Sequence, residues 1–353
     1  MRALLLLLVA GCGAQADDAT SDWQWQLPAR FPTPVVPADN PMSADKVELG
    51  RFLFHDTRLS ANGTQACASC HVQESAFTDG RATPLGSTGQ PGVHNAMSLT
   101  NVAYNSSSTW AHDVANLEDQ ALLPMFGAAP VEMGNAGRES ELLARLTAEP
   151  VYGELFPRAF GDEPFTIANV TRAIASFERT IVSGNSRFDR FVAGDAAALA
   201  ANEQRGLALF ESDRLGCTHC HGGFNLASAY AFEGERRVQM FNTGLYDADG
   251  SGAYPAGDQG LVEVTGLARD MGRFRAPTLR NIAVTAPYFH DGSAATLDAV
   301  IDHYARGGVN SPLQSPFVTG FMLTDAERAD LIAFLQALTD ESLLTNPAYA
   351  SPW

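Results

Sequence analysis

The chain has 353 residues, of which 45% are hydrophobic and 18% are charged, a mixture typical of folded globular proteins and unlike that of disordered chains. This length allows two or three domains with a sizeable core. The formal net charge of −17 argues against nucleic acids and anionic membrane surfaces as partners, because the long-range field of the protein repels both.

The chain begins with a short export segment. Met1-Arg2 is followed by an apolar run that ends at Ala10, which is too short to cross a bilayer. The sequence Val9-Ala10-Gly11-Cys12 resembles the lipobox of bacterial lipoproteins, so we predict a signal peptide over residues 1–11 and a lipidated Cys12. Gly13 then favours the outer membrane, on its periplasmic side. An ordinary signal peptide with an incidental cysteine is the alternative.

Prolines follow the export segment, and they predict an extended tether over residues 12–42, so that the fold begins near residue 43. The prolines of this stretch are Pro28, Pro32, Pro34, Pro37 and Pro41.

Apolar spacing predicts the helices of the folded part. Ser43 can cap a first helix, which contains a Gly-x-x-Leu-Phe pattern that ends at Phe54. Thr166 can cap a second helix whose apolar stripe belongs to the core, and Thr324 with Glu327 forms a capping box for a last helix. The Gly-x-x-Leu-Phe pattern returns before Phe210, which suggests two similar helical units.

A cysteine motif follows each copy of this pattern: Cys67-Ala68-Ser69-Cys70-His71 and Cys217-Thr218-His219-Cys220-His221. Cys-x-x-Cys-His is the attachment signature of c-type haem, in which two thiols bind the haem covalently and the histidine ligates the iron. A four-cysteine zinc site is one alternative, but its cysteine pairs usually lie about 15–20 residues apart, whereas these lie 150 apart. A redox dithiol is the other alternative, and it does not require the histidine.

With these motifs the chain resembles the bacterial di-haem cytochrome c peroxidase and MauG superfamily, and its pattern is closest to MbnH-like di-haem enzymes. The resemblance covers roughly residues 43–340, and its most specific block is His290-Asp291-Gly292. The other matching stretches are His94 to Trp110, Leu117 to Ala121, Val131 to Gly134, Arg275 to Asn281, Thr285 to Phe289 and Thr296-Leu297.

The resemblance implies a mostly α protein of two cytochrome c-like helical domains, with one covalently bound c-type haem in each. Residues 43–190 would form the N-terminal, peroxidatic domain, and residues 191–353 the C-terminal, electron-transfer domain. His71 and His221 would be the proximal iron ligands.

The resemblance also implies roles for three residues near the first haem. Glu132 matches the distal acid, which would move a proton between the two oxygens of a bound peroxide. Gln120 matches a distal amide, and Trp110 matches the tryptophan between the haems, where an indole could relay electrons. The ordinary alternatives are a solvated glutamate, an exposed helical glutamine and a core tryptophan.

Asn95 matches the side-chain ligand of a calcium ion between the domains, and Thr285 and Pro287 match its backbone carbonyl ligands. One position departs from the family, because many members carry a histidine that caps the first iron, and the matching position is near Ser87. We therefore expect an open sixth position at the first iron, with a swing of His94 onto that iron as the alternative.

The distal ligand of the second iron decides the function. Peroxidases of this family place a methionine fourteen residues after the histidine of His-Asp-Gly, and the same count from His290 reaches Tyr304, as in MauG and MbnH-like enzymes. A phenolate is a hard, anionic ligand that stabilises high oxidation states, whereas a thioether raises the potential. The alternatives are a half-buried helix tyrosine, with His303, Met271 or Met322 as the ligand.

We therefore expect a periplasmic di-haem oxidoreductase that reacts with hydrogen peroxide at the N-terminal haem. Like its MbnH-like relatives, it would use a high-valent di-haem state to oxidise a residue, expected to be tryptophan, of a partner protein. In MauG a surface tryptophan lies two residues before the second motif, where this chain has Leu215, so the route to a partner must differ. The alternatives are a cytochrome c peroxidase fed by a small cytochrome c or cupredoxin, and a non-catalytic di-haem electron carrier.

Overall fold

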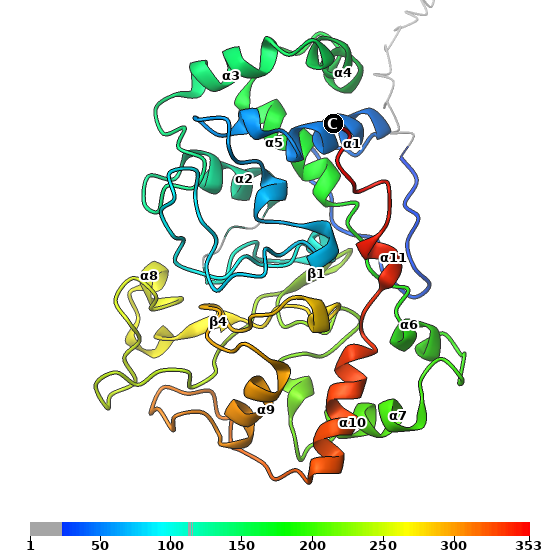
Figure 1. Cartoon of the computed structure of the whole chain (residues 1–353), viewed down its shortest axis with the longest axis vertical. Helices are drawn as coiled ribbons and strands as arrows, with labels where there is room; N and C mark the ends of the chain where they lie inside the picture. The colour runs from blue at the N-terminus through cyan, green and yellow to red at the C-terminus, as the bar shows by residue number, and fades with distance from the viewer. Residues whose placement is uncertain (1–22, 112–113, 115) are drawn as a thin grey trace, which may run out of the picture.

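The computed structural model describes residues 23–111, 114 and 116–353, so the signal peptide and Cys12 lie outside the described residues. The chain is mostly helical, as predicted (Figure 1). The longer helices are α1 (Ala44–Phe54), α2 (Leu117–Phe126), α3 (Glu139–Thr147), α4 (Pro150–Phe160), α5 (Ile167–Glu178), α7 (Ala201–Phe210), α9 (Leu297–Ala305) and α10 (Asp325–Gln336). The shorter ones are α6 (Arg187–Val192), α8 (Val262–Thr265) and α11 (Glu341–Leu344).

The strands are short and form two antiparallel pairs. β1 (Tyr230–Phe232) pairs with β2 (Glu235–Arg237), and β3 (Met240–Asn242) pairs with β4 (Arg273–Arg275). No helix within the described ranges is both long and apolar enough to cross a membrane.

The predicted helix caps are present. The Ser43 side chain accepts a hydrogen bond from the backbone N–H of Lys46 at the start of α1, and that of Thr166 accepts one from Asn169 at the start of α5. At α10, Thr324 and Glu327 exchange the two hydrogen bonds of a capping box. Each cap satisfies N–H groups that the first turn of a helix leaves without a partner.

Two hydrophobic clusters lie at opposite ends of the molecule (Figure 1). The first is built mainly on the packing of α1 against α5, and the second on that of α7 against α10. Each helix pair has an equivalent close contact, made by the glycine of the repeated Gly-x-x-Leu-Phe pattern. Gly50 of α1 lies against Ala173 and Phe177, and Gly206 of α7 lies against Asp330 and Phe334.

Replacing Gly206 by alanine is expected to lower the free energy of unfolding. A Cβ atom there would lie 2.0 Å from the carbonyl oxygen of Asp330, so α7 and α10 would have to move apart, at a cost of about 1–3 kcal/mol. Gly153 of α4 is the matched control, because a Cβ there would meet nothing within 4 Å and alanine should stabilise the helix by about 0.5–1 kcal/mol. Urea unfolding of both variants measures the difference, and equal effects would contradict the packing argument.

Both ends of the described chain cross between the two clusters. Phe31 lies 5.1 Å from Phe224 and 6.0 Å from Tyr104, measured between ring centroids, and the Tyr104 hydroxyl donates to the carbonyl of Pro32. The described part of the stretch predicted as a tether begins at residue 23 and contains no helix, and from about residue 28 it packs on both parts of the protein.

The last residues return from α10 to the first cluster (Figure 1). Leu343 and Tyr349 belong to that cluster, and the Tyr349 carbonyl accepts a hydrogen bond from His55 Nε2 at 3.0 Å. The Trp353 ring lies 5.2 Å from that of Phe52. The predicted boundary at residue 190 stays a prediction, although this segment clearly packs on the first part.

Candidate active site

The first cysteine motif forms a single tight turn. Cys67–Ser69 is a 3-10 helix, and the N–H groups of Cys70 and His71 both donate to the Cys67 carbonyl, at 3.1 and 3.0 Å. This turn holds two thiols and an imidazole within five residues. The Nδ1 atom of His71 lies 2.9 Å from the Phe77 carbonyl, so the ring hydrogen belongs on Nδ1 and the lone pair on Nε2. Burial lowers the pKa of His71, which favours this neutral form.

The second motif repeats the geometry. Cys217–His219 is a 3-10 helix, and the N–H of His221 donates to the Cys217 carbonyl at 2.9 Å. His221 Nδ1 lies 3.1 Å from the carbonyl of Pro277 and 3.3 Å from that of Leu226. Burial lowers the pKa of His221 as well. Each motif therefore presents one neutral imidazole with Nε2 available to a metal.

The chemistry of these donors fits covalent haem. The four thiols are free rather than paired in disulfides, and burial raises the pKa of Cys70 and Cys217 to about 11 and that of Cys220 to about 12. A redox dithiol instead needs a thiolate, which this burial disfavours. No group of three or more His, Cys, Asp or Glu side chains within the described residues is arranged to hold a metal ion. The zinc and dithiol alternatives thus lack support.

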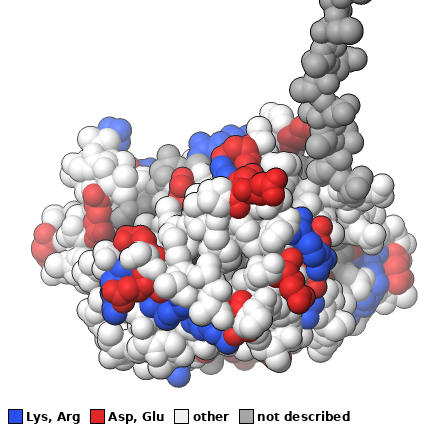
Figure 2. Space-filling model, turned by 90° about the horizontal axis from the view of Figure 1, so that it is seen from above, with Lys and Arg blue, Asp and Glu red and all other residues white. Residues whose placement is uncertain are grey.

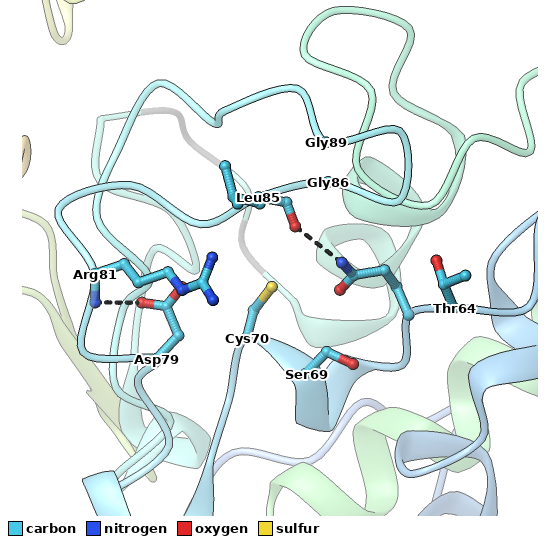
Figure 3. A pocket seen from close by; sticks show the side chains of 9 residues that line it. Thr64, Ser69, Cys70, Asp79, Arg81, Leu85, Gly86 and Gly89 are labelled. Carbon is cyan, nitrogen blue, oxygen red and sulfur yellow. Dashed lines mark hydrogen bonds between the residues drawn. The ribbon is translucent and has the colours of Figure 1, made fainter.

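A pocket of about 320 Å³ opens beside the first motif. The Cys70 sulfur points into it, with Arg81 on one side and the Leu85–Gly89 loop opposite (Figure 3). This loop lies directly on the segment that carries Glu132. A Cβ atom at Gly86 would be 1.9 Å from the Val131 carbonyl oxygen, and the Ser87 N–H donates to the Glu132 carbonyl at 2.6 Å.

Glu132 faces the first motif. Its carboxylate lies close enough to raise the pKa of both Cys67 and Cys70. The side chain is half-buried, and burial raises the pKa of Glu132. A half-buried carboxyl group with a raised pKa is suited to proton transfer.

Gln120 and Trp110 lie in different surroundings. Gln120 is half-buried on α2. The same helix holds the segment of Glu132, because the Pro124 carbonyl accepts a hydrogen bond from the N–H of Met133, the residue after Glu132. The Trp110 indole N–H donates to the Asn95 carbonyl at 2.8 Å. Its ring belongs to a small cluster between the two larger ones and lies 6.5 Å from the His290 ring.

His94 is held by the second half of the chain. Its Nε2 atom lies 2.9 Å from one carboxylate oxygen of Asp258, and His290 Nε2 lies 3.1 Å from the other. Burial alone would raise the pKa of Asp258, but these hydrogen bonds outweigh it and the pKa is lowered. The position expected for a capping histidine, Ser87, instead lies on the loop over Glu132.

The three predicted calcium ligands come from segments that touch. The Asn95 amide nitrogen donates to the Arg81 carbonyl at 2.7 Å, and the Asn95 N–H donates to the His290 carbonyl. The Gly80–Ala82 stretch lies against Ala286 and Gly292. Thr285 is buried and Pro287 half-buried, beside Ala286 in this contact.

Tyr304, on α9, faces the second motif. Burial raises the pKa of its phenol, and the neighbouring Cys220 and Cys217 raise it further. The alternative ligands are placed less favourably. His303 Nε2 lies 2.9 Å from the Thr243 carbonyl, and Met322 is 84% exposed. Met271 packs with the small cluster that contains Trp110.

Sequence reasoning assigns no role to three charged residues near these sites: the half-buried Asp258 and the buried Arg275 and Glu178. Asp258 and Arg275 form hydrogen bonds with residues that are far away in sequence, and no spacing in the sequence predicts these pairs. Glu178 carries a signal, because it is an acid at the end of the apolar stripe of α5. It is 4% exposed, one carboxylate oxygen has no hydrogen-bond partner, and the charge raises the pKa of Cys67.

Replacing Glu178 by glutamine is expected to change how stability depends on pH. Burial raises the pKa of Glu178 from 4.5 to about 8, so the folded protein binds a proton that the unfolded chain releases. Stability should therefore fall as the pH rises from about 4.5 to 8, and the variant should be more stable at pH 8 by on the order of a few kcal/mol. Urea unfolding at several pH values measures this, with the exposed Glu154 replaced by glutamine as the control. Equal slopes in wild type and Glu178→Gln would contradict it.

Comparisons with known proteins agree on one family. A family model described as di-haem cytochrome c peroxidase matches residues 44–197. Cytochrome-c peroxidase IdrP1 of Denitromonas iodatirespirans is 36% identical over 353 residues, which cover 95% of this chain and 92% of that protein. The methylamine utilization protein MauG of Methylorubrum extorquens is 35% identical over 336 residues, or 94% and 90% of the two chains.

A solved structure is more similar still. It is that of a MauG-like protein associated with microbial copper homeostasis, with 46% sequence identity and a TM-score of 0.91. The match covers 94% of this chain and 99% of that one.

Proposed function

Since the chain belongs to the di-haem cytochrome c peroxidase family, and is thus a haem-dependent oxidoreductase that acts with peroxide, we propose that it oxidises a residue of a partner protein, as MauG-like enzymes do. The family implies two c-type haems. The observation that carries the finer proposal is the phenol of Tyr304, which lies beside the thiols of the second motif. A phenolate ligand stabilises the higher oxidation states of iron, whereas a methionine ligand stabilises the reduced, ferrous state.

Each motif would hold one haem through its two thiols, with His71 and His221 as proximal ligands and Tyr304 as the distal ligand at the second site. When bound, the haems would supply two redox-active irons. The carbonyls of Phe77 and Pro277 fix the two imidazoles.

The side chains around the first motif would handle the protons. Glu132 would carry a proton between the two oxygens of peroxide, and Gln120 would donate a hydrogen bond to the peroxide. Hydrogen peroxide takes up two electrons and two protons to form two waters, so the partner supplies two electrons. Trp110, between the two parts, would help these electrons to cross.

The experiment is the addition of one equivalent of hydrogen peroxide to the fully oxidised protein, followed by absorption spectroscopy. We expect a spectral change without any reductant. A response only after reduction of one haem would favour the second candidate, a peroxidase that receives electrons from a small cytochrome c or cupredoxin. The similarity to a cytochrome-c peroxidase supports this candidate. Two low-spin haems that never respond would indicate an electron carrier.

The setting of the reaction is also a proposal. The relative at 46% identity is described as associated with microbial copper homeostasis, and we propose the same setting for this chain, with a periplasmic partner whose oxidised residue is a tryptophan. Acidic and basic side chains are interspersed on the face shown in Figure 2, so this face does not identify the partner by charge.

We further propose a lipid anchor at Cys12, in the outer membrane, and one calcium ion held by Asn95, Thr285 and Pro287. A Cys12→Ala variant should no longer be found in the membrane fraction. If it stays in that fraction, the proposed lipid anchor at Cys12 is wrong. Elemental analysis of the purified protein, before and after dialysis against a chelator, tests the calcium ion.

A further inference from the structure

A buried arginine, linked to the supports of both cysteine motifs, forms no ion pair with any carboxylate of the residues that the structure describes. Arg275, at the end of β4, is 3% exposed. Its guanidinium contacts the sulfur of Met97 at 3.0 Å and the carbonyl of Thr109 at 3.3 Å. A thioether is a weak acceptor, and no carboxylate of the described residues pairs with this cation. A buried charge without a partner is strongly unfavourable, so we expect an anionic group to lie against this guanidinium in the functional protein.

The position of Arg275 suggests where that anion comes from. Two residues further along the chain, Pro277 offers its carbonyl to His221. On the other side, the Met97 carbonyl interacts with His71, and the N–H of Arg275 donates to the Trp110 carbonyl at 2.8 Å. Arg275 is therefore adjacent to the supports of both proximal histidines.

Resting on the proposed di-haem function, we propose that Arg275 binds haem propionate carboxylates and supplies the positive charge that sets the potential of the neighbouring iron. Propionates are the anions that a haem brings, and a guanidinium binds carboxylates through two parallel hydrogen bonds.

The first test is redox titration of Arg275→Gln holoprotein. Loss of a positive charge beside an iron favours the ferric form, so the midpoint potential of at least one haem should fall. We expect about a tenfold change in the redox equilibrium, which is 59 mV for one electron. Arg275→Lys should keep most of the wild-type potential. Arg273→Gln is the matched control, because it removes a charge from the same strand where the side chain is 41% exposed and lies 3.8 Å from Asp270.

The second test is the stability of Arg275→Met. Without an anion, replacing a buried unpaired charge by an apolar side chain should stabilise the protein; with propionate bound, it should destabilise the holoprotein. A more stable variant with unchanged potentials would overturn the proposal. If neither neutral variant yields di-haem protein while Arg275→Lys and Arg273→Gln do, the charge requirement is supported. Loss of haem from Arg275→Lys too would show that shape, not charge, is needed.

Haem content separates this inference from the function on which it rests. A wild-type protein with fewer than two haems by mass would overturn the proposed di-haem function itself. Two haems in every variant, with potentials equal to those of Arg273→Gln, would overturn only the role of Arg275.

Discussion

Replacing Glu132 by glutamine is expected to slow peroxide consumption by about 10²- to 10⁴-fold, the usual contribution of a positioned acid–base group. Glutamine keeps the shape and the half-buried position of the side chain but cannot carry the proton between the two oxygens. The carboxyl group has a raised pKa because it is buried, which brings its protonation equilibrium closer to neutral pH. Initial rates of peroxide loss, measured with a saturating electron donor, give the effect.

The pH profile and a control distinguish chemistry from damage. The wild-type rate should change across the pH range in which Glu132 titrates, and the variant should lose that limb of the profile. Glu74, an exposed acid three residues after His71, serves as the matched control, and its replacement by glutamine should leave the rate unchanged. If Glu132→Gln consumes peroxide at the wild-type rate, the proton is moved by another group.

Replacing Tyr304 by methionine should convert the response to peroxide. A thioether in place of a phenolate should raise the potential of the second iron by on the order of 0.1 V or more, within the range of about 0.8 V that axial ligands cover. The oxidised variant should then show no spectral change with one equivalent of peroxide, and should react only after one haem has been reduced. Redox titration and absorption spectroscopy measure the two effects.

A second tyrosine provides the comparison. Tyr246 is a half-buried phenol hydrogen-bonded to Asp291, and Tyr246→Phe should retain the wild-type response. Identical behaviour of the oxidised wild type and Tyr304→Met toward one equivalent of peroxide would remove Tyr304 from the proposed mechanism. The second candidate, a cytochrome c peroxidase that receives electrons from a small redox protein, would then be favoured.

The parts of the site that the sequence could predict are those built from local chemistry. A Cys-x-x-Cys-His turn carries its thiols and imidazole within five residues, so its geometry follows from one 3-10 turn. The caps at Ser43 and Thr166 are local in the same sense. The packing role of Gly50 and Gly206 could be suspected from the repeat, but only the contacts with α5 and α10 explain why glycine is needed.

The parts that the sequence could not predict depend on residues far apart in the chain. Asp258 binds His94 and His290, which are separated by 196 positions, and no spacing rule connects them. Arg275 is unusual because it is buried and pairs with no carboxylate in the part of the chain that the structure describes. Within the proline-rich stretch predicted as a tether, Phe31 packs against rings from both parts, which composition alone cannot reveal.

The return of the last residues to the first cluster constrains the order of assembly. Tyr349 and Leu343 complete a core whose other buried members lie between residues 49 and 181. We therefore expect the first part to reach its final packing only after the C-terminal segment has been synthesised, which follows the synthesis of both cysteine turns.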